Sequence, residues 1–163
     1  MKKRVYFDKC QEMKFISHLD LLRFFERLFN KSDIPVKYSN GFHPRPKMSF
    51  ASPISLGTEA FNEVMDFEVT EEISNEEVKD RLNSNGVLGF YVHKVCDVDK
   101  KSSIMDCCTN ILYEISGSKE DIDKIQNLMN EEEIIQIKEK RGVEGGVEKS
   151  PMLALTGGLL CDF

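Results

Sequence analysis

Residues 15–50 read FISHLDLLRFFERLFNKSDIPVKYSNGFHPRPKMSF, and this stretch holds two of the chain's three histidines and three of its five prolines. Ser17 and Asp20 have the spacing of a helix start, with a hydroxyl at the N-cap and a carboxylate in the electropositive first turn. At about 100° per residue, the charged side chains that follow fall on one arc and the apolar ones on another. The apolar arc comprises Leu21, Leu22, Phe24, Phe25, Leu28 and Phe29. The pattern predicts an amphipathic helix over residues 17–31 that packs on a sheet or on another helix.

The segments around this helix show strand periodicity and one further helix signal. Residues 63–69 alternate, with Met65 and Phe67 on one face and Asp66 on the other. Ser74 and Glu77 form a capping box that opens a second helix. Strands are predicted over residues 4–10, 35–38, 47–54, 63–69 and 88–95. This order predicts an α+β fold, a ferredoxin-like split βαβ whose helices share one face of an antiparallel sheet. Its predicted core includes Phe25, Leu28, Phe29, Met65 and Phe67.

The changes in composition along the chain predict four parts. Residues 1–96 form the ferredoxin-like domain, and the polar residues 97–109 form a linker. Residues 110–141 form a partial second β-α-β unit, with strands over 111–116 and 133–140 around a helix that Ser118 caps. The remaining residues, 142–163, match no period and are expected to be irregular.

The charge of the chain is unevenly distributed. The net charge is −6, but residues 1–60 hold 11 Lys and Arg against 6 Asp and Glu, whereas residues 61–163 hold 11 against 22. An acidic protein binds nucleic acid poorly through its overall field, yet a basic first third can form a local patch. The alternative is that these are simply solvated faces of opposite sign.

Several features predict a cytoplasmic protein. No apolar run approaches the roughly 18 residues that a membrane span needs, and the first ten residues, MKKRVYFDKC, contain no apolar signal core. The five cysteines are an odd number without framework spacing, which favours reduced thiols. We therefore expect neither a membrane location nor disulfides.

Residues 38–50, named here the basic loop, combine rigidity with groups that a core cannot use. Gly41 breaks the chain, and Pro44 and Pro46 stiffen it around aromatic and cationic side chains. Such a surface suits stacked bases and phosphates. We expect the loop to form one ligand-contacting edge with the start of the helix. The candidate ligand-binding residues are His18, Asp20, Arg23, Tyr38, Asn40, Phe42, His43, Arg45 and Lys47.

These same residues carry a resemblance to a known family. The segments concerned are Phe15–Asp20, Arg23, Pro35, Tyr38-Ser39, Gly41–Ala51, Leu56-Gly57 and Asp66. They resemble the bacterial radical SAM-linked domain family, whose domains are fused to radical SAM proteins or encoded beside them, often near a ribonuclease G/E gene. The resemblance covers roughly residues 3–140 and is specific over 15–66. It implies a radical SAM protein as partner and implies no reaction, because the family has no settled activity.

A catalytic alternative uses the two histidines of this region. His18 and His43 could act as an acid/base pair oriented by Asp20, with Arg45 or Lys47 stabilising negative charge, as in metal-independent RNA cleavage. Alternatively, Asp20 only caps the helix, His18 bonds a backbone carbonyl and His43 is merely exposed.

A metal site or cofactor is not expected. A site built from His18, His43, Glu63 and Asp66 lacks any close ligand spacing. The C-x-x-x-C-x-x-C triplet with which radical SAM enzymes hold an iron–sulfur cluster is also absent from the sequence.

Three functions remain open at this stage. The first is a non-catalytic accessory module of a radical SAM-associated system that contacts RNA, or an RNA-modifying partner, through the basic loop. The second is a small metal-independent nuclease or transferase that uses His18 and His43. The third is a purely protein-binding subunit, which the acidic second half favours. Binding that weakens steeply with salt would separate the first from the third.

Overall fold

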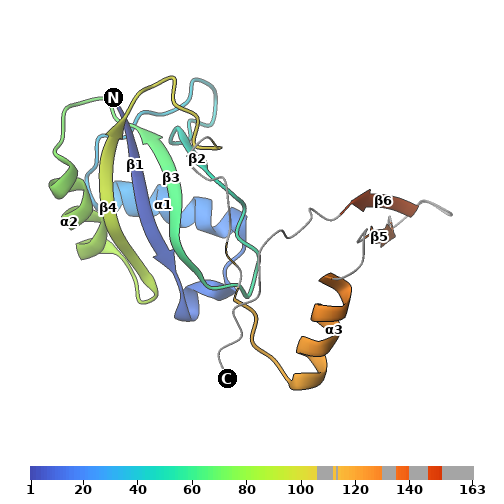
Figure 1. The fold of residues 1–163 in the computed structure, drawn as a ribbon. Helices are drawn as coiled ribbons and strands as arrows, with labels where there is room; N and C mark the ends of the chain where they lie inside the picture. The colour runs from blue at the N-terminus through green and yellow to red at the C-terminus, as the bar shows by residue number, and fades with distance from the viewer. Residues whose placement is uncertain (106–111, 113, 130–134, 140–146, 152–163) are drawn as a thin grey trace. The chain divides into compact units, whose positions relative to one another are not determined.

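The computed structural model of the chain describes residues 1–105, 112, 114–129, 135–139 and 147–151. The chain divides into two compact units, Met1–Thr109 and Asn110–Phe163. The first unit contains a four-stranded antiparallel sheet in the order β2-β3-β1-β4 (Figure 1). Its elements are β1 (Lys2–Lys9), a short 3-10 helix (Gln11–Phe15), α1 (His18–Lys31), β2 (Met48–Phe50), β3 (Ala60–Glu68), α2 (Asn75–Asn85) and β4 (Phe90–Val98). The predicted α+β fold of the split βαβ type is confirmed.

Both helices of this unit begin where their capping residues predict. The Ser17 hydroxyl accepts a hydrogen bond from the backbone N–H of Asp20 at the start of α1. The Ser74 hydroxyl accepts the equivalent bond from the N–H of Glu77 at the start of α2. Each bond satisfies an N–H that has no partner within its own helix.

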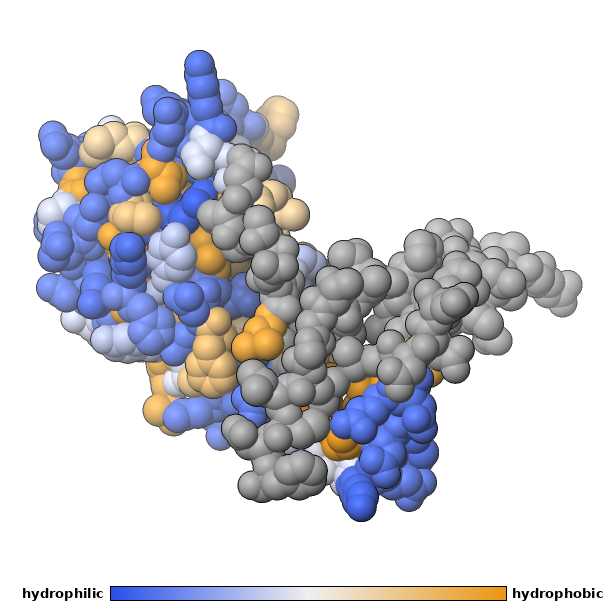
Figure 2. Space-filling view, in the orientation of Figure 1, coloured by the Kyte–Doolittle hydropathy of each residue, from blue (hydrophilic) through white to orange (hydrophobic). Residues whose placement is uncertain are grey.

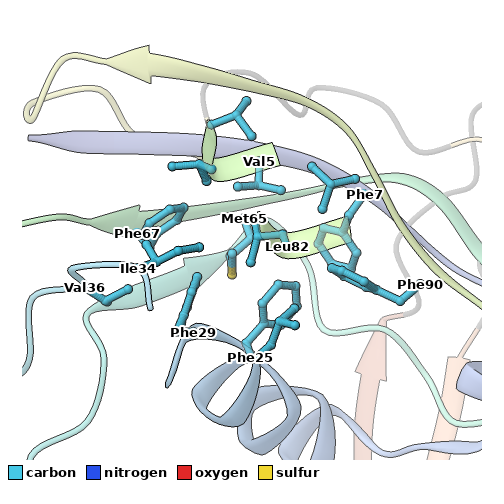
Figure 3. Close-up of a cluster of buried hydrophobic side chains, with 14 of the residues drawn as sticks. Val5, Phe7, Phe25, Phe29, Ile34, Val36, Met65, Phe67, Leu82 and Phe90 are labelled. Carbon is cyan, nitrogen blue, oxygen red and sulfur yellow. The ribbon is translucent and has the colours of Figure 1, made fainter. Parts of the chain in front are cut away.

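The core lies between the helices and one face of the sheet (Figure 3). The ring of Phe25 on α1 contacts Phe7 on β1, Phe50 on β2 and Phe90 on β4, at centroid distances of 5.1, 5.5 and 5.5 Å. Leu82 joins this core from α2 and is fully buried. All the predicted core residues are buried: Phe25, Leu28, Phe29, Met65 and Phe67.

The two edges of the sheet are built differently. At one edge, β2 has only three residues, and Val36 then continues the pairing by bridging Val69. At the other edge, the side-chain amide of Asn83 on α2 bonds both backbone groups of Val92 on β4. Its Nδ2 donates to the Val92 carbonyl at 3.0 Å, and its Oδ1 accepts from the Val92 N–H at 2.8 Å. The outer edge of β4 is thus closed at this position.

Among the described elements of this unit, no helix covers the second face of the sheet, which is the side seen in Figure 1, with α1 behind it. In the same orientation, the coloured surface of this unit is mostly hydrophilic, with separate apolar patches (Figure 2). The segment Asp99–Met105 is tied to this face. Lys2 Nζ donates to the Ser102 carbonyl at 2.7 Å, and Ile104 is 7% exposed.

This segment lies within the stretch that the sequence predicted as a linker. β4 extends to Val98, two residues beyond the predicted end of the domain at 96. The described part of the linker, residues 97–105, thus comprises the end of β4 and the segment bound by Lys2. A polar sequence alone does not distinguish a solvated connection from a segment whose carbonyls accept hydrogen bonds from the sheet.

The second unit differs from its predicted pattern in strand pairing. It contains α3 (Lys119–Met129) and a two-stranded antiparallel sheet of β5 (Ile135–Glu139) and β6 (Val147–Pro151). Residues 112 and 114–116, where a strand was predicted, are not in a strand. The partner of β5 is instead β6, within the stretch expected to be irregular; residues 152–163 lie outside the described residues.

In the part of the chain that the structure describes, no helix is both long enough and apolar enough to span a membrane.

Replacing Phe25 by Ala is expected to lower the free energy of unfolding by about 3–5 kcal/mol, because the ring is fully buried and bridges three strands. Urea unfolding followed by circular dichroism would measure this loss. Phe61→Ala is the matched control, since Phe61 is 64% exposed and should change stability by no more than about 0.5 kcal/mol. A loss below about 1 kcal/mol for Phe25→Ala would contradict the packing described.

Candidate ligand-binding loop

The basic loop is closed at its base by a short two-stranded ribbon. The Lys47 N–H donates to the Lys37 carbonyl and the Ser39 N–H to the Arg45 carbonyl, both at 2.8 Å. The Arg45 N–H donates to the Ser39 hydroxyl at 3.0 Å. Gly41 at the tip has a φ of +146°, which residues with a Cβ rarely adopt. The sequence thus builds a hairpin-like projection rather than a simple strand connection.

The tip of this projection is fully exposed. Residues 40–44 are all exposed, whereas Pro46 at the base is buried. Phe42 is 102% exposed, so its ring contacts nothing that shields it from water. An exposed aromatic ring on a tip closed by a hydrogen-bonded base presents a stacking face to a ligand.

Two side chains of the loop contact α1. The Tyr38 hydroxyl donates to Asn30 Oδ1 at 2.8 Å. Arg45 Nη1 lies 3.9 Å from Glu26 Oε1, a buried carboxylate oxygen that has no hydrogen-bond partner within the described part of the chain. The Arg45 side chain is still 66% exposed, so most of its donors remain available to a ligand. The loop therefore contacts α1 at the middle and the end of the helix.

At the start of α1, Asp20 acts as a capping residue. Its carboxylate accepts from the Ser17 hydroxyl at 2.7 Å and from Arg23 Nη1 at 3.0 Å. These two hydrogen bonds, from Ser17 and then Arg23, lower the pKa of Asp20. Both partners lie on its own helix or cap, and among the described residues Asp20 forms no hydrogen bond with a histidine.

His18 lies at the same end but packs inward. Its ring makes an edge contact with Phe50, at a centroid distance of 5.4 Å, and its Nδ1 is buried without a hydrogen-bond partner. Among the described residues, no hydrogen bond or ring contact joins His18 to His43, which is exposed at the loop tip. His18 and His43 therefore do not touch each other in this structure.

The residues considered for a metal site also diverge. Glu63 and Asp66 are three residues apart on β3, so their side chains leave opposite faces of the sheet. Glu63 is paired with Phe7 and lies on the core side, where burial raises its pKa. Asp66 is paired with Arg4 on the other side. Within the described ranges, no group of three or more His, Cys, Asp or Glu side chains is placed to hold a metal ion.

The base of the loop leads into a depression of about 360 Å³, named here the lysine depression. It lies where β2, β3, the start of β1 and the segment after β4 meet. Its polar lining residues are Lys2, Lys47, Ser49, Asp66, Glu68 and Lys100.

A buried ion-pair network forms one side of this depression. Asp66 is 1% exposed, and its Oδ1 accepts from Arg4 Nε at 2.7 Å. Its Oδ2 accepts from Arg4 Nη2 at 3.0 Å and lies 2.8 Å from Lys2 Nζ. Burial alone would raise the pKa of Asp66, but hydrogen bonds from Arg4 and Lys2 outweigh it and the pKa is lowered. The carboxylate is thus charged, and two cations surround it.

The second carboxylate of the depression is also paired. Glu68 Oε2 lies 3.0 Å from Lys37 Nζ. The hydrogen bond from Lys37 lowers the pKa of Glu68, and the nearby charges of Lys47 and Lys100 add to this effect. The lysines therefore outnumber the acids they face.

Comparison with known proteins gives one match. Residues 2–154 match the family described as an uncharacterized protein conserved in bacteria (DUF2344). The chain belongs to the DUF2344 family. No curated protein and no solved structure shows significant similarity to it.

Two features of this DUF2344 member were not predicted from its sequence. Lys2 and Lys100 reach the base of the loop from distant positions, and only the sheet topology places them there. His93 Nε2 lies 2.7 Å from Asp8 Oδ2, so the carboxylate-paired histidine of the described residues is His93 rather than His18. In a split βαβ the first and last strands are neighbours. The predicted strand order therefore already placed the strand that carries Asp8 beside the strand that carries His93, and it could have suggested this pair.

Replacing Asp66 by Asn is expected to lower the free energy of unfolding by about 3–5 kcal/mol near neutral pH, because it removes the anion that Arg4 and Lys2 surround. Since the folded-state pKa of Asp66 is lowered, its contribution is present above the unfolded pKa of about 3.9 and is lost as pH falls below that value. Urea unfolding at several pH values would show a smaller loss of stability on acidification in Asp66→Asn than in the wild type.

The control for this experiment is Asp80→Asn, at an exposed position on α2, which should change stability by less than about 0.5 kcal/mol. Equal losses in the two variants would contradict the role given to the buried network.

Proposed function

We propose that this chain is a non-catalytic binding module that contacts RNA through the basic loop. The observation that carries the proposal is the complete exposure of Phe42 on a tip closed by a hydrogen-bonded ribbon. A free aromatic ring in a folded protein gives up contacts that burial would supply. A stacked base restores such contacts without requiring a particular sequence.

Two cationic side chains that could pair with RNA phosphates follow Phe42 closely in the sequence. Arg45 and Lys47 lie on one strand of the ribbon, and both are exposed. Small sheet-based domains bind RNA by stacking bases on aromatic rings while Arg and Lys pair with phosphates. Phe42, Arg45 and Lys47 supply both kinds of group within six residues of chain.

The module is proposed to be non-catalytic because two of its candidate acid and base groups, Asp20 and His18, are engaged elsewhere, whereas His43 is exposed at the loop tip. Asp20 bonds Ser17 and Arg23, and the His18 ring packs on Phe50. General acid–base catalysis needs both groups within hydrogen-bond reach of one substrate atom or of a bridging water. Binding needs only the exposed loop.

The proposed partner is a radical SAM protein. This part of the proposal is supported by the resemblance of residues 15–66 to radical SAM-linked domains, a stretch that includes the whole basic loop. In this arrangement the iron–sulfur chemistry belongs to the partner, and the loop holds RNA for it.

Phe42→Ala is expected to weaken binding of a single-stranded RNA of about ten nucleotides by about 1–3 kcal/mol, nearly independently of salt, because stacking is lost. Fluorescence anisotropy at several salt concentrations would measure it. Phe61→Ala is the matched control, as an exposed phenylalanine at the opposite end of β3 from the loop base. If the two variants weaken binding equally, or if Phe42→Ala unfolds the domain, the proposed contact is wrong.

Arg45→Ala is expected to weaken RNA binding and to reduce the slope of log affinity against log salt by about one unit, because one phosphate contact is removed. Lys101→Ala serves as the control for a general change in charge, since Lys101 is exposed and outside the loop. Wild-type protein that binds no RNA but captures a radical SAM protein would favour a purely protein-binding subunit. Shortening of the RNA, abolished by His18→Ala or His43→Ala, would favour the nuclease alternative.

A further inference from the structure

We propose that the lysine depression is a phosphate-binding site. This inference goes beyond the proposed function, because the site would take a phosphate group whether it belongs to an RNA backbone or to a small molecule. It is carried by the convergence of Lys2, Lys47 and Lys100 on one depression. These residues come from three distant segments of the chain, so the cluster is a product of the fold and not of a basic run in the sequence.

The backbone that carries Lys100 is held in place. The Ser102 N–H donates to the Asp99 carbonyl at 3.0 Å, which closes a turn around Lys100 and Lys101. The Asp99 carboxylate accepts from the Lys101 N–H at 3.0 Å. Lys2 Nζ then binds the Ser102 carbonyl at 2.7 Å and fixes the turn to the sheet. Lys100 therefore faces the depression from an ordered position.

Lys47 is held equally firmly from the other side. Its N–H donates to the Lys37 carbonyl at 2.8 Å, and its carbonyl accepts from the Glu68 N–H at 3.1 Å. The residue is thus bonded to two neighbouring strands. A site whose backbone is already ordered loses less conformational entropy when an anion binds.

The charges around the depression leave a positive surplus. Arg4 and Lys2 surround Asp66, and Lys37 pairs with Glu68. Within the described part of the chain, Lys47 and Lys100 form no ion pair within 4.0 Å, although both lie close enough to Glu68 to lower its pKa. The depression itself is lined by three lysines, Lys2, Lys47 and Lys100, and by two carboxylates, Asp66 and Glu68. The surplus is therefore positive and is concentrated on one face.

The chemistry of the lining selects phosphate over a metal ion. Both oxygens of Asp66 and Oε2 of Glu68 are already engaged by arginine or lysine, which leaves these carboxylates poorly suited to bind a cation. The Ser49 hydroxyl adds a donor to the ammonium groups. Lysine ammonium groups bind phosphate as point charges, and a volume of about 360 Å³ can accommodate a phosphate with its attached group.

The test uses adjacent lysines that differ only in where they face. Lys100 lines the depression, whereas Lys101 is an exposed residue of the same turn that does not line it. Inorganic phosphate would be titrated into the full chain at constant ionic strength, and amide shifts would be followed by NMR. We expect saturable shifts around the depression. Lys100→Gln should weaken phosphate binding about fivefold, and Lys101→Gln should weaken it by less than about twofold.

A second arm identifies the source of the phosphate group. If the site takes an RNA backbone phosphate, Lys100→Gln also weakens binding of single-stranded RNA and reduces its salt slope by about one unit, while Lys101→Gln does not. If it takes a small phosphorylated molecule, Lys100→Gln weakens only the binding of inorganic phosphate and leaves RNA affinity unchanged.

Two outcomes would overturn the phosphate site: no saturable binding of phosphate by the wild type, or equal weakening by Lys100→Gln and Lys101→Gln, which would indicate a general field effect. Neither outcome depends on Phe42, so the phosphate site and RNA binding by the loop can fail separately.

Discussion

The ring of Phe25 lies against Phe7, Phe50 and Phe90, and through these contacts a single side chain of α1 packs on β1, β2 and β4. The basic loop lies between α1 and β2 in the chain. Its base is bonded to β3, because Lys37 and Lys47 both exchange backbone hydrogen bonds with Glu68, and its Tyr38 and Arg45 side chains contact α1. The packing of α1 on the sheet therefore helps to position the exposed tip, although no residue of the tip is buried.

The open face of the sheet depends on a different constraint, which is electrostatic. Asp66 is a buried charge, and such a charge is tolerated only when it is paired and hydrogen-bonded. Arg4 and Lys2 meet this need, and Lys2 also binds the Ser102 carbonyl. One lysine thereby connects the buried anion to the segment that carries Lys100. The lysine depression therefore depends on Lys2, the same residue that helps to neutralise Asp66.

Much of the fold could be predicted because its signals are local. Ser17 and Ser74 each indicate the start of a helix, and period-2 alternation indicates β3. Each of these signals lies within a few residues of sequence. The candidate site was harder to predict from the sequence, because the convergence of distant residues depends on strand order and on side-chain direction. His18 and His43 are 25 residues apart, and His18 turns into the core beside Phe50. Lys100 lies in a stretch whose polarity resembled a linker, and only its hydrogen-bonded turn distinguishes it.

The amide of Asn83 occupies both backbone groups of Val92 on the outer strand of the sheet. An exposed strand edge is a template on which another chain can add a strand, which leads to aggregation or domain swapping. The Asn83 amide takes the place of a neighbouring strand's backbone and so removes that template near the start of β4. This region of the sheet is consequently protected against self-association through strand addition, even though none of the described strands lies beside β4 on that edge.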